Sequence, residues 1–110
     1  MNTLDYKGYE VSLASTAFYD GNLAVIMLDE YGRMHARLTV NLPNYHKTDA
    51  SCAYVDSNNH PTIVNWLKRN NIAEPTGMIA HSGFCEYPEM RFNLESEYFE
   101  KERISLDVWK

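Results

Sequence analysis

The chain has 110 residues, of which 45% are hydrophobic, and it carries a net charge of −5. This length and composition are typical of one folded globular domain and exclude a largely disordered protein. The longest apolar run, residues 23–28, is far shorter than the roughly 20 residues that a membrane-spanning helix needs. The first ten residues lack the positive start and apolar stretch of a signal peptide, so we expect a cytoplasmic protein that does not enter a membrane.

The distribution of charge argues against direct binding to duplex nucleic acid. Proteins that bind duplexes usually concentrate their basic residues on one face. Here the ten lysines and arginines are scattered along the chain. Residues 86–110 hold seven acidic and four basic residues, so this short region alone contributes −3 to the net charge.

The first 28 residues are predicted to form strands. Residues on either side of Lys7-Gly8 alternate between apolar and polar side chains, and Gly8 can supply the positive φ of a tight turn. A second turn is expected at Asp20-Gly21-Asn22. Residues 23–28 are apolar at every position, which is typical of a central strand that is covered on both faces.

The next segment, residues 33–41, has the clearest alternation in the chain. It follows a turn at residues 30–32 and stops before Pro43, and it predicts a strand with one buried face and one wet face. The residues expected on the buried face are Met34, Ala36, Leu38 and Val40. After a polar loop, residues 52–56 predict one more short strand.

One helix is predicted between residues 59 and 71. Pro61 suits the first helical position, with Asn59 or His60 before it as the N-cap. The apolar stripe of this helix, with Trp66 beside it, is formed by Ile63, Val64 and Leu67.

Two turn signals follow the helix. Residues 74–77 have proline second and glycine fourth, as in a tight turn, and residues 82–83 predict another. Residues 78–81 between them are long enough for a short strand. Pro88 lies in the strand expected over residues 84–94, and because proline cannot donate to a ladder, that strand lies at an edge or carries a bulge there.

These segments together predict an α+β fold. We expect a single domain over residues 1–94, with a mostly antiparallel sheet of about five strands and one main helix packed on one face. Residues 95–110 are expected to form an acidic C-terminal extension that is either docked or mobile.

The sequence contains no standard catalytic motif, and we expect neither a cofactor nor a metal. His81 and Cys85 flank a Ser-Gly turn and could form a nucleophilic pair, or be an exposed histidine and a buried thiol. Cys52 and His60 could join them around zinc, but structural zinc sites usually draw on close-spaced ligand pairs, which are missing here. The two cysteines are expected to be reduced thiols.

Tyrosines and glutamates supply the candidate binding residues. Exposed tyrosine is favoured at protein interfaces, and three of the eight tyrosines fall in predicted turns or loops. The glutamates of the C-terminal extension either form a negative surface for a partner or only keep the protein soluble. The candidate protein-binding residues are Tyr19, Tyr31, Tyr45, Glu95, Glu97, Glu100 and Glu102.

Three segments resemble a small family of bacterial proteins that carry a domain of unknown function. The segments are LTVNLP at 38–43, WLKRNNIAEPTG at 66–77 and SGFCEYP at 82–88, and the resemblance spans about residues 5–94. Members have roughly this length and are carried by conjugative elements, plasmids and phages. The resemblance implies an α+β fold and a mobile-element context, and it brings no catalytic residues.

Three functions follow as hypotheses. The leading one is a non-enzymatic accessory protein of a mobile element that binds a host protein or one encoded by the element, most specifically as an inhibitor of a restriction or CRISPR defence system. The second is a structural or regulatory accessory protein, as a homodimer joined through an edge strand or the C-terminal extension. The third is an unrecognised enzyme that uses Cys85 and His81.

Overall fold

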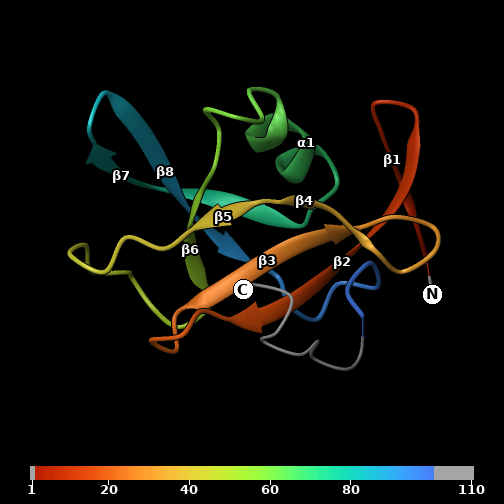
Figure 1. Ribbon diagram of the computed structural model, residues 1–110, viewed down its shortest axis with the longest axis horizontal. Helices are drawn as coiled ribbons and strands as arrows, with labels where there is room; N and C mark the ends of the chain where they lie inside the picture. Colours follow the sequence, from red (N-terminus) through yellow and green to blue (C-terminus); the bar gives the residue numbers. More distant parts are fainter. Residues whose placement is uncertain (1, 101–110) are drawn as a thin grey trace.

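The computed structural model describes residues 2–100, which fold into eight strands and one helix (Figure 1). The strands are β1 (Leu4–Tyr6), β2 (Tyr9–Ala17), β3 (Leu23–Leu28), β4 (Met34–Arg37), β5 (Thr39–Val40), β6 (Cys52–Val55), β7 (Ala73–Ser82) and β8 (Cys85–Phe92). The helix is α1 (Ile63–Arg69). Figure 1 shows the β7–β8 hairpin and the loop after β5 on the opposite side of the molecule from the β1–β2 hairpin.

The strands pair into two antiparallel sheets of four strands each, in the orders β1-β2-β3-β4 and β5-β6-β8-β7. Side chains of both sheets and of α1 meet in one main hydrophobic core. The predicted α+β class and the mostly antiparallel pairing are therefore confirmed. The strands are more numerous than the predicted five and form two sheets, because several are too short to show a period in the sequence.

The predicted strand over residues 33–41 is divided between the two sheets at Leu38. β4 pairs with β3 in the first sheet, and β5 pairs with β6 in the second. Leu38 is fully buried; its N–H donates to the carbonyl of Val25 at 3.0 Å, and its carbonyl accepts from the N–H of Asp56 at 2.9 Å. The prediction that Met34 lies in the core is wrong, because β4 is the outer strand of its sheet and leaves Met34 exposed.

Strand β3 confirms the prediction of a central strand that is covered on both faces. All six of its residues are buried. Leu23, Val25 and Met27 belong to the main core, whereas Ile26 and Leu28 form a second cluster with Ala14 of β2. The uninterrupted apolar run is therefore explained by burial on two sides.

The helix forms where it was predicted but is shorter. It begins at Ile63, with Thr62 at the N-cap position, so Pro61 precedes the helix and is not its first residue. Ile63 and Leu67 are buried in the main core, and α1 contacts β7. Trp66 joins α1 to β1, because its indole N–H donates to the carbonyl of Asp5 at 2.9 Å.

The prediction of a turn at residues 74–77 is wrong, because these residues lie within strand β7. The chain stays extended from Ala73 to Ser82, and the register with β8 shifts between Pro75 and Ile79. Gly77, with φ of +95°, lies inside this bulge, so the turn residues bend a strand without reversing it. Pro88 pairs with Ile79 beside the bulge, and β6 pairs with β8 only from Glu89 onward, which explains how β8 accommodates a proline.

Part of the expected C-terminal extension packs onto the domain. The N–H of Leu13 donates to the carbonyl of Tyr98 at 2.9 Å, and the carbonyl of Leu13 accepts from the N–H of Glu100 at 2.8 Å. Phe99, between them, is buried in the main core. Residues 101–110, which include Glu102, lie outside the described residues.

Substitution of Leu38 by alanine should lower the free energy of unfolding by about 3 kcal/mol, because the shorter side chain would leave a cavity between the two sheets. Val40→Ala is the matched control, since Val40 is only half-buried and its truncation should cost about 1 kcal/mol. Urea denaturation followed by circular dichroism measures both values. Equal losses in the two variants would contradict the central position of Leu38.

Candidate functional site

The loop between β5 and β6 is fastened to the second sheet. We call residues 43–51 the strap. The hydroxyl of Tyr54 donates to the carbonyl of His46 at 2.5 Å. Nε and Nη2 of Arg91 donate to Oδ2 of Asp49 at 3.1 and 3.0 Å. The strap is therefore held at His46 by a side chain of β6 and at Asp49 by a side chain of β8.

Glu89 of β8 is the most unusual residue of this region, because it is an acidic side chain with no exposed surface. Its carboxylate accepts from the N–H and Oγ1 of Thr48 at 2.8 and 2.6 Å, and from Oγ1 of Thr76 at 2.5 Å. Burial raises the pKa of Glu89, but these hydrogen bonds and nearby Arg91 outweigh it, so the pKa lies below its usual range. One ionised carboxylate thus joins the strap, β7 and β8.

Tyr45 of the strap covers part of the outer edge of β7. Its hydroxyl donates to the carbonyl of His81 at 2.9 Å and accepts from the N–H of the same residue at 3.1 Å. β7 is the last strand of its sheet, so an incoming strand would need these two backbone groups. Tyr45 therefore protects the edge at His81 against pairing with another chain.

The hairpin of β7 and β8 carries exposed apolar side chains. Its turn consists of Gly83 and Phe84, and the φ of +61° at Gly83 fits a type II′ turn with glycine first. Phe84 is completely exposed at 109%, and Met78 and Ile79 are 57% and 51% exposed. We call these three residues the hairpin surface. Glu74 and Glu86, both exposed, lie on the same hairpin.

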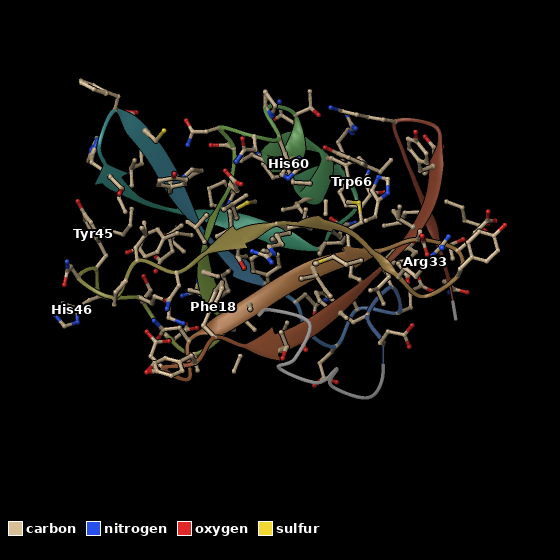
Figure 2. All side chains as sticks on the ribbon, viewed as in Figure 1. Phe18, Arg33, Tyr45, His46, His60 and Trp66 are labelled. Carbon is tan, nitrogen blue, oxygen red and sulfur yellow. The ribbon has the colours of Figure 1, made fainter. Side chains whose placement is uncertain are left out.

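The predicted tyrosines do not share one surface. Tyr19 is 98% exposed in the turn before β3, and Tyr31 is 72% exposed in the turn after it. The strand between them separates the two turns by about 20 Å. Figure 2 shows Tyr45 at one end of the molecule and Arg33, two residues after Tyr31, at the other.

The predicted glutamates have different surroundings. Glu95 and Glu97 are exposed, and the side-chain amide of Asn2 donates to the carboxylate of Glu97. Glu100 is half-buried. Glu102 lies outside the described residues.

The hairpin register separates His81 from Cys85. His81 pairs with Glu86, and Ser82 pairs with Cys85. Because neighbouring residues of a strand point to opposite faces, the imidazole and the thiol lie on opposite faces of the hairpin. Both cysteines are free thiols. Within residues 2–100, no group of three or more histidine, cysteine, aspartate or glutamate side chains could hold a metal ion.

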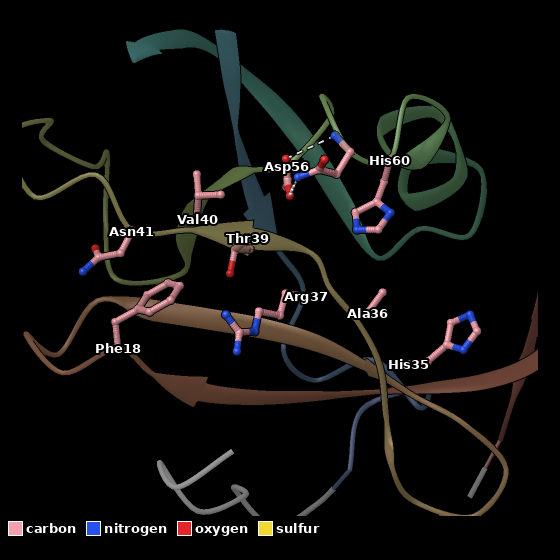
Figure 3. Close-up of a pocket in the computed structure, with 10 residues that line it drawn as sticks. Phe18, His35, Ala36, Arg37, Thr39, Val40, Asn41, Asp56 and His60 are labelled. Atoms are coloured by element: carbon pink, nitrogen blue, oxygen red, sulfur yellow. Dashed lines mark hydrogen bonds between the residues drawn. The ribbon is translucent and has the colours of Figure 1, made fainter. Parts of the chain in front are cut away.

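A cleft of about 560 Å³ opens beside Leu38, where the chain passes from the first sheet to the second. Its lining includes Phe18, His35, Arg37 and His60, and Figure 3 shows Arg37 between the rings of Phe18 and His60. Sequence reasoning missed this cleft, because its walls come from distant segments that meet only in the folded chain.

Comparison with known families gives one match. The sequence pattern of the family described as "Domain of unknown function (DUF4313)" matches residues 12–107. The chain belongs to the DUF4313 family. The match extends beyond residue 94, into the acidic segment of this chain that the resemblance in the sequence did not cover. No curated protein and no solved structure matches the chain. In the described part of this DUF4313 protein, no helix has the length and hydrophobicity needed to cross a membrane.

Substitution of Glu89 by glutamine should lower the free energy of unfolding by about 2 kcal/mol, because the N–H of Thr48 or one threonine hydroxyl loses its charged acceptor. The matched control is Glu74→Gln on β7, which removes an exposed carboxylate and should change stability by less than about 0.5 kcal/mol. Chemical denaturation at pH 7 gives both values. A loss in the control as large as that in Glu89→Gln would indicate a general charge effect.

The stability of the protein should fall on acidification through the carboxylates that hold the strap. The pKa of Glu89 lies below its usual value of 4.5 in the folded chain, so its contribution is complete above that pH and is lost as the pH falls below it. Hydrogen bonds from Ser51 and Arg91 hold the pKa of Asp49 far below its usual range, so the contribution of Asp49 to stability is also lost on acidification. Unfolding measured from pH 7 to pH 3 should show a smaller decline in Glu89→Gln than in the unaltered protein. Parallel curves would contradict this linkage.

Substitution of Tyr45 by phenylalanine should open the edge of β7 at His81 while keeping the aromatic ring. The amide proton of His81 should exchange about tenfold faster, because its hydrogen bond to the tyrosine hydroxyl is lost. Nuclear magnetic resonance measures this exchange, and sedimentation measures self-association, which should increase. Tyr31→Phe, in an exposed turn, is the control. Unchanged protection of His81 would mean that Tyr45 does not cover the edge.

Proposed function

We propose that this DUF4313 protein is a non-enzymatic protein-binding protein whose partner docks on the hairpin surface. The observation that carries the proposal is the complete exposure of Phe84 at the tip of a hairpin that also exposes Met78 and Ile79. Large apolar side chains exposed to solvent are typical of docking sites, and aromatic residues are frequent among those that dominate binding energy.

The covered edge of β7 favours docking through side chains. Because the hydroxyl of Tyr45 occupies both backbone groups of His81, a second strand cannot pair there without displacing the strap. This disfavours a homodimer formed by pairing of β7 edges at His81.

The partner is best described as a basic protein. The hairpin surface is accompanied by the exposed acids Glu74 and Glu86, and the whole chain has a net charge of −5. Complementary charge accelerates association and selects among partners. Proteins that handle nucleic acids carry basic surfaces of this kind.

The biological role that we propose is accessory to a mobile element, in the cytoplasm of its host, as an inhibitor of a restriction or CRISPR defence protein. The support is the resemblance of residues 38–43, 66–77 and 82–88 to proteins of conjugative elements, plasmids and phages. Two free cysteines fit a reducing compartment. Restriction and CRISPR proteins bind nucleic acid, which agrees with a basic partner for an acidic chain.

Affinity capture from host lysate should recover one protein in stoichiometric amount, and Phe84→Ser with Met78→Ser should reduce its recovery at least about tenfold through loss of two apolar anchors. The partner is then identified by mass spectrometry, and the affinity of the purified pair is measured in low and high salt. Weaker binding at high salt is expected if charge guides the complex.

Matched variants locate the surface. Tyr19→Ser with Tyr31→Ser removes two exposed aromatic residues elsewhere and should leave capture unchanged. Charge reversal of Glu95, Glu97, Glu100 and Glu102 together should weaken capture of a basic partner in part but not abolish it, because the hairpin surface is kept. Loss of capture in either of these variants with retention in the hairpin variant would keep a protein-binding function but refute the hairpin surface. Recovery of no stoichiometric partner would refute the function.

A further inference from the structure

We propose that the cleft beside Leu38 binds a small organic anion, of the size of a nucleoside monophosphate, with its ring against Phe18 and its anionic group toward Arg37 and His60. This inference is independent of the proposed protein-binding function. The volume of about 560 Å³ lies within the range of small-ligand sites, which runs from about 300 to 1,000 Å³.

The charge of the cleft differs from that of the chain. The nitrogen-bearing rings and the guanidinium on its walls come from His35, Arg37 and His60. Asp56 is the one acidic residue on the lining, and its carboxylate accepts from the N–H of Asn59 at 3.3 Å and from the side-chain amide of Asn59 at 2.9 Å. Arg37 and Asp56 are the formally charged residues of the lining and balance each other, so the cleft repels an anion less than the rest of a chain of net charge −5 does.

The remaining polar groups of the lining are used within the protein. Oγ1 of Thr39 accepts from the N–H of Val25 at 3.0 Å, and the amide of Asn41 is bonded to Asp20 and Asn22. These bonds fix the walls, and the other polar side chains on the lining include those of the two histidines and Arg37. Arg37 already has another interaction, so a ligand would share its guanidinium.

The shape of the cleft separates the two parts of such a ligand. Figure 3 shows Phe18 at one side of Arg37 and His60 at the other, with Ala36 and Val40 also on the lining. A planar ring can pack against the phenyl ring and the aliphatic side chains, where it loses apolar surface to water. A phosphate or carboxylate then meets the guanidinium, which suits bidentate recognition of either group.

The binding position relies on the crossing of the chain between the sheets. Arg37 ends β4, Thr39 begins β5, and Leu38 between them is buried and bonded to both sheets. His60 is held by its N–H, which donates to the carbonyl of Asp56 at 3.1 Å. Arg37 and His60 therefore project from backbone that is fixed before any ligand arrives, which limits the entropy lost on binding.

Titration of the full chain with adenosine monophosphate, followed by amide resonances, tests this site. The resonances of Arg37, Thr39, Asn59 and His60 should move together along one saturable curve. Adenosine, which lacks the anionic group, and inorganic phosphate, which lacks the ring, should each bind at least about tenfold more weakly. Benzoate tests whether a carboxylate replaces the phosphate.

Two variants discriminate specific binding from general attraction to positive charge. His60→Gln should weaken adenosine monophosphate binding about tenfold, because a ring that can hydrogen-bond the anionic group is removed from the cleft wall. Arg33→Gln is the control, since Arg33 lies in the β3–β4 turn and pairs with Asp29. Amide shifts confined to the cleft and lost in His60→Gln support the site. Shifts spread over many basic residues, equal affinity in His60→Gln, or no saturable shift at millimolar ligand would overturn it.

Discussion

The rest of the structure depends on Leu38, the residue at which the chain leaves one sheet and enters the other. Its N–H is bonded to Val25 in β3, and its carbonyl to Asp56 after β6, so one peptide segment carries a hydrogen bond to each sheet. A buried backbone group without a partner is costly, and both groups of this residue are satisfied. The side chain fills the space between the sheets. The core, the cleft and the helix that follows Asp56 are all arranged around this crossing.

Sequence patterns predicted the elements whose environment is uniform along their length. β3 is buried on both faces, and its unbroken apolar run indicated this. The helix is amphipathic over Ile63–Leu67, and its stripe was visible. The division at Leu38 could not be predicted, because the alternation continues through residues 34–40 while the hydrogen-bonding partners change. The period of apolar residues indicates which face of a strand is buried, but it does not indicate which other strands pair with that strand.

The same limit explains why the candidate site was predicted only in part. The sequence predicts Tyr45 to be an exposed interface residue and gives no sign that its hydroxyl binds the backbone of His81, a contact between residues 36 positions apart. Glu89 has the sequence appearance of a solvated acid between Pro88 and Met90. It is buried because Thr48 and Thr76, from the strap and β7, supply its hydrogen bonds. Both residues form hydrogen bonds with partners that are distant in the sequence.

The strap has a consequence for how the hairpin surface is presented. Burying an ionised carboxylate is unfavourable unless several hydrogen-bond donors surround it. The donors to Glu89 come from two segments, the strap and β7. The buried carboxylate therefore stabilises the positions of both segments at once. Tyr45 holds β7 from its outer side at His81, close to the turn that exposes Phe84. A hairpin held in this way loses little conformational freedom when a partner binds it. The hydrogen bonds of Glu89 and Tyr45 thus stabilise the position of the exposed apolar residues on which we propose that another protein docks.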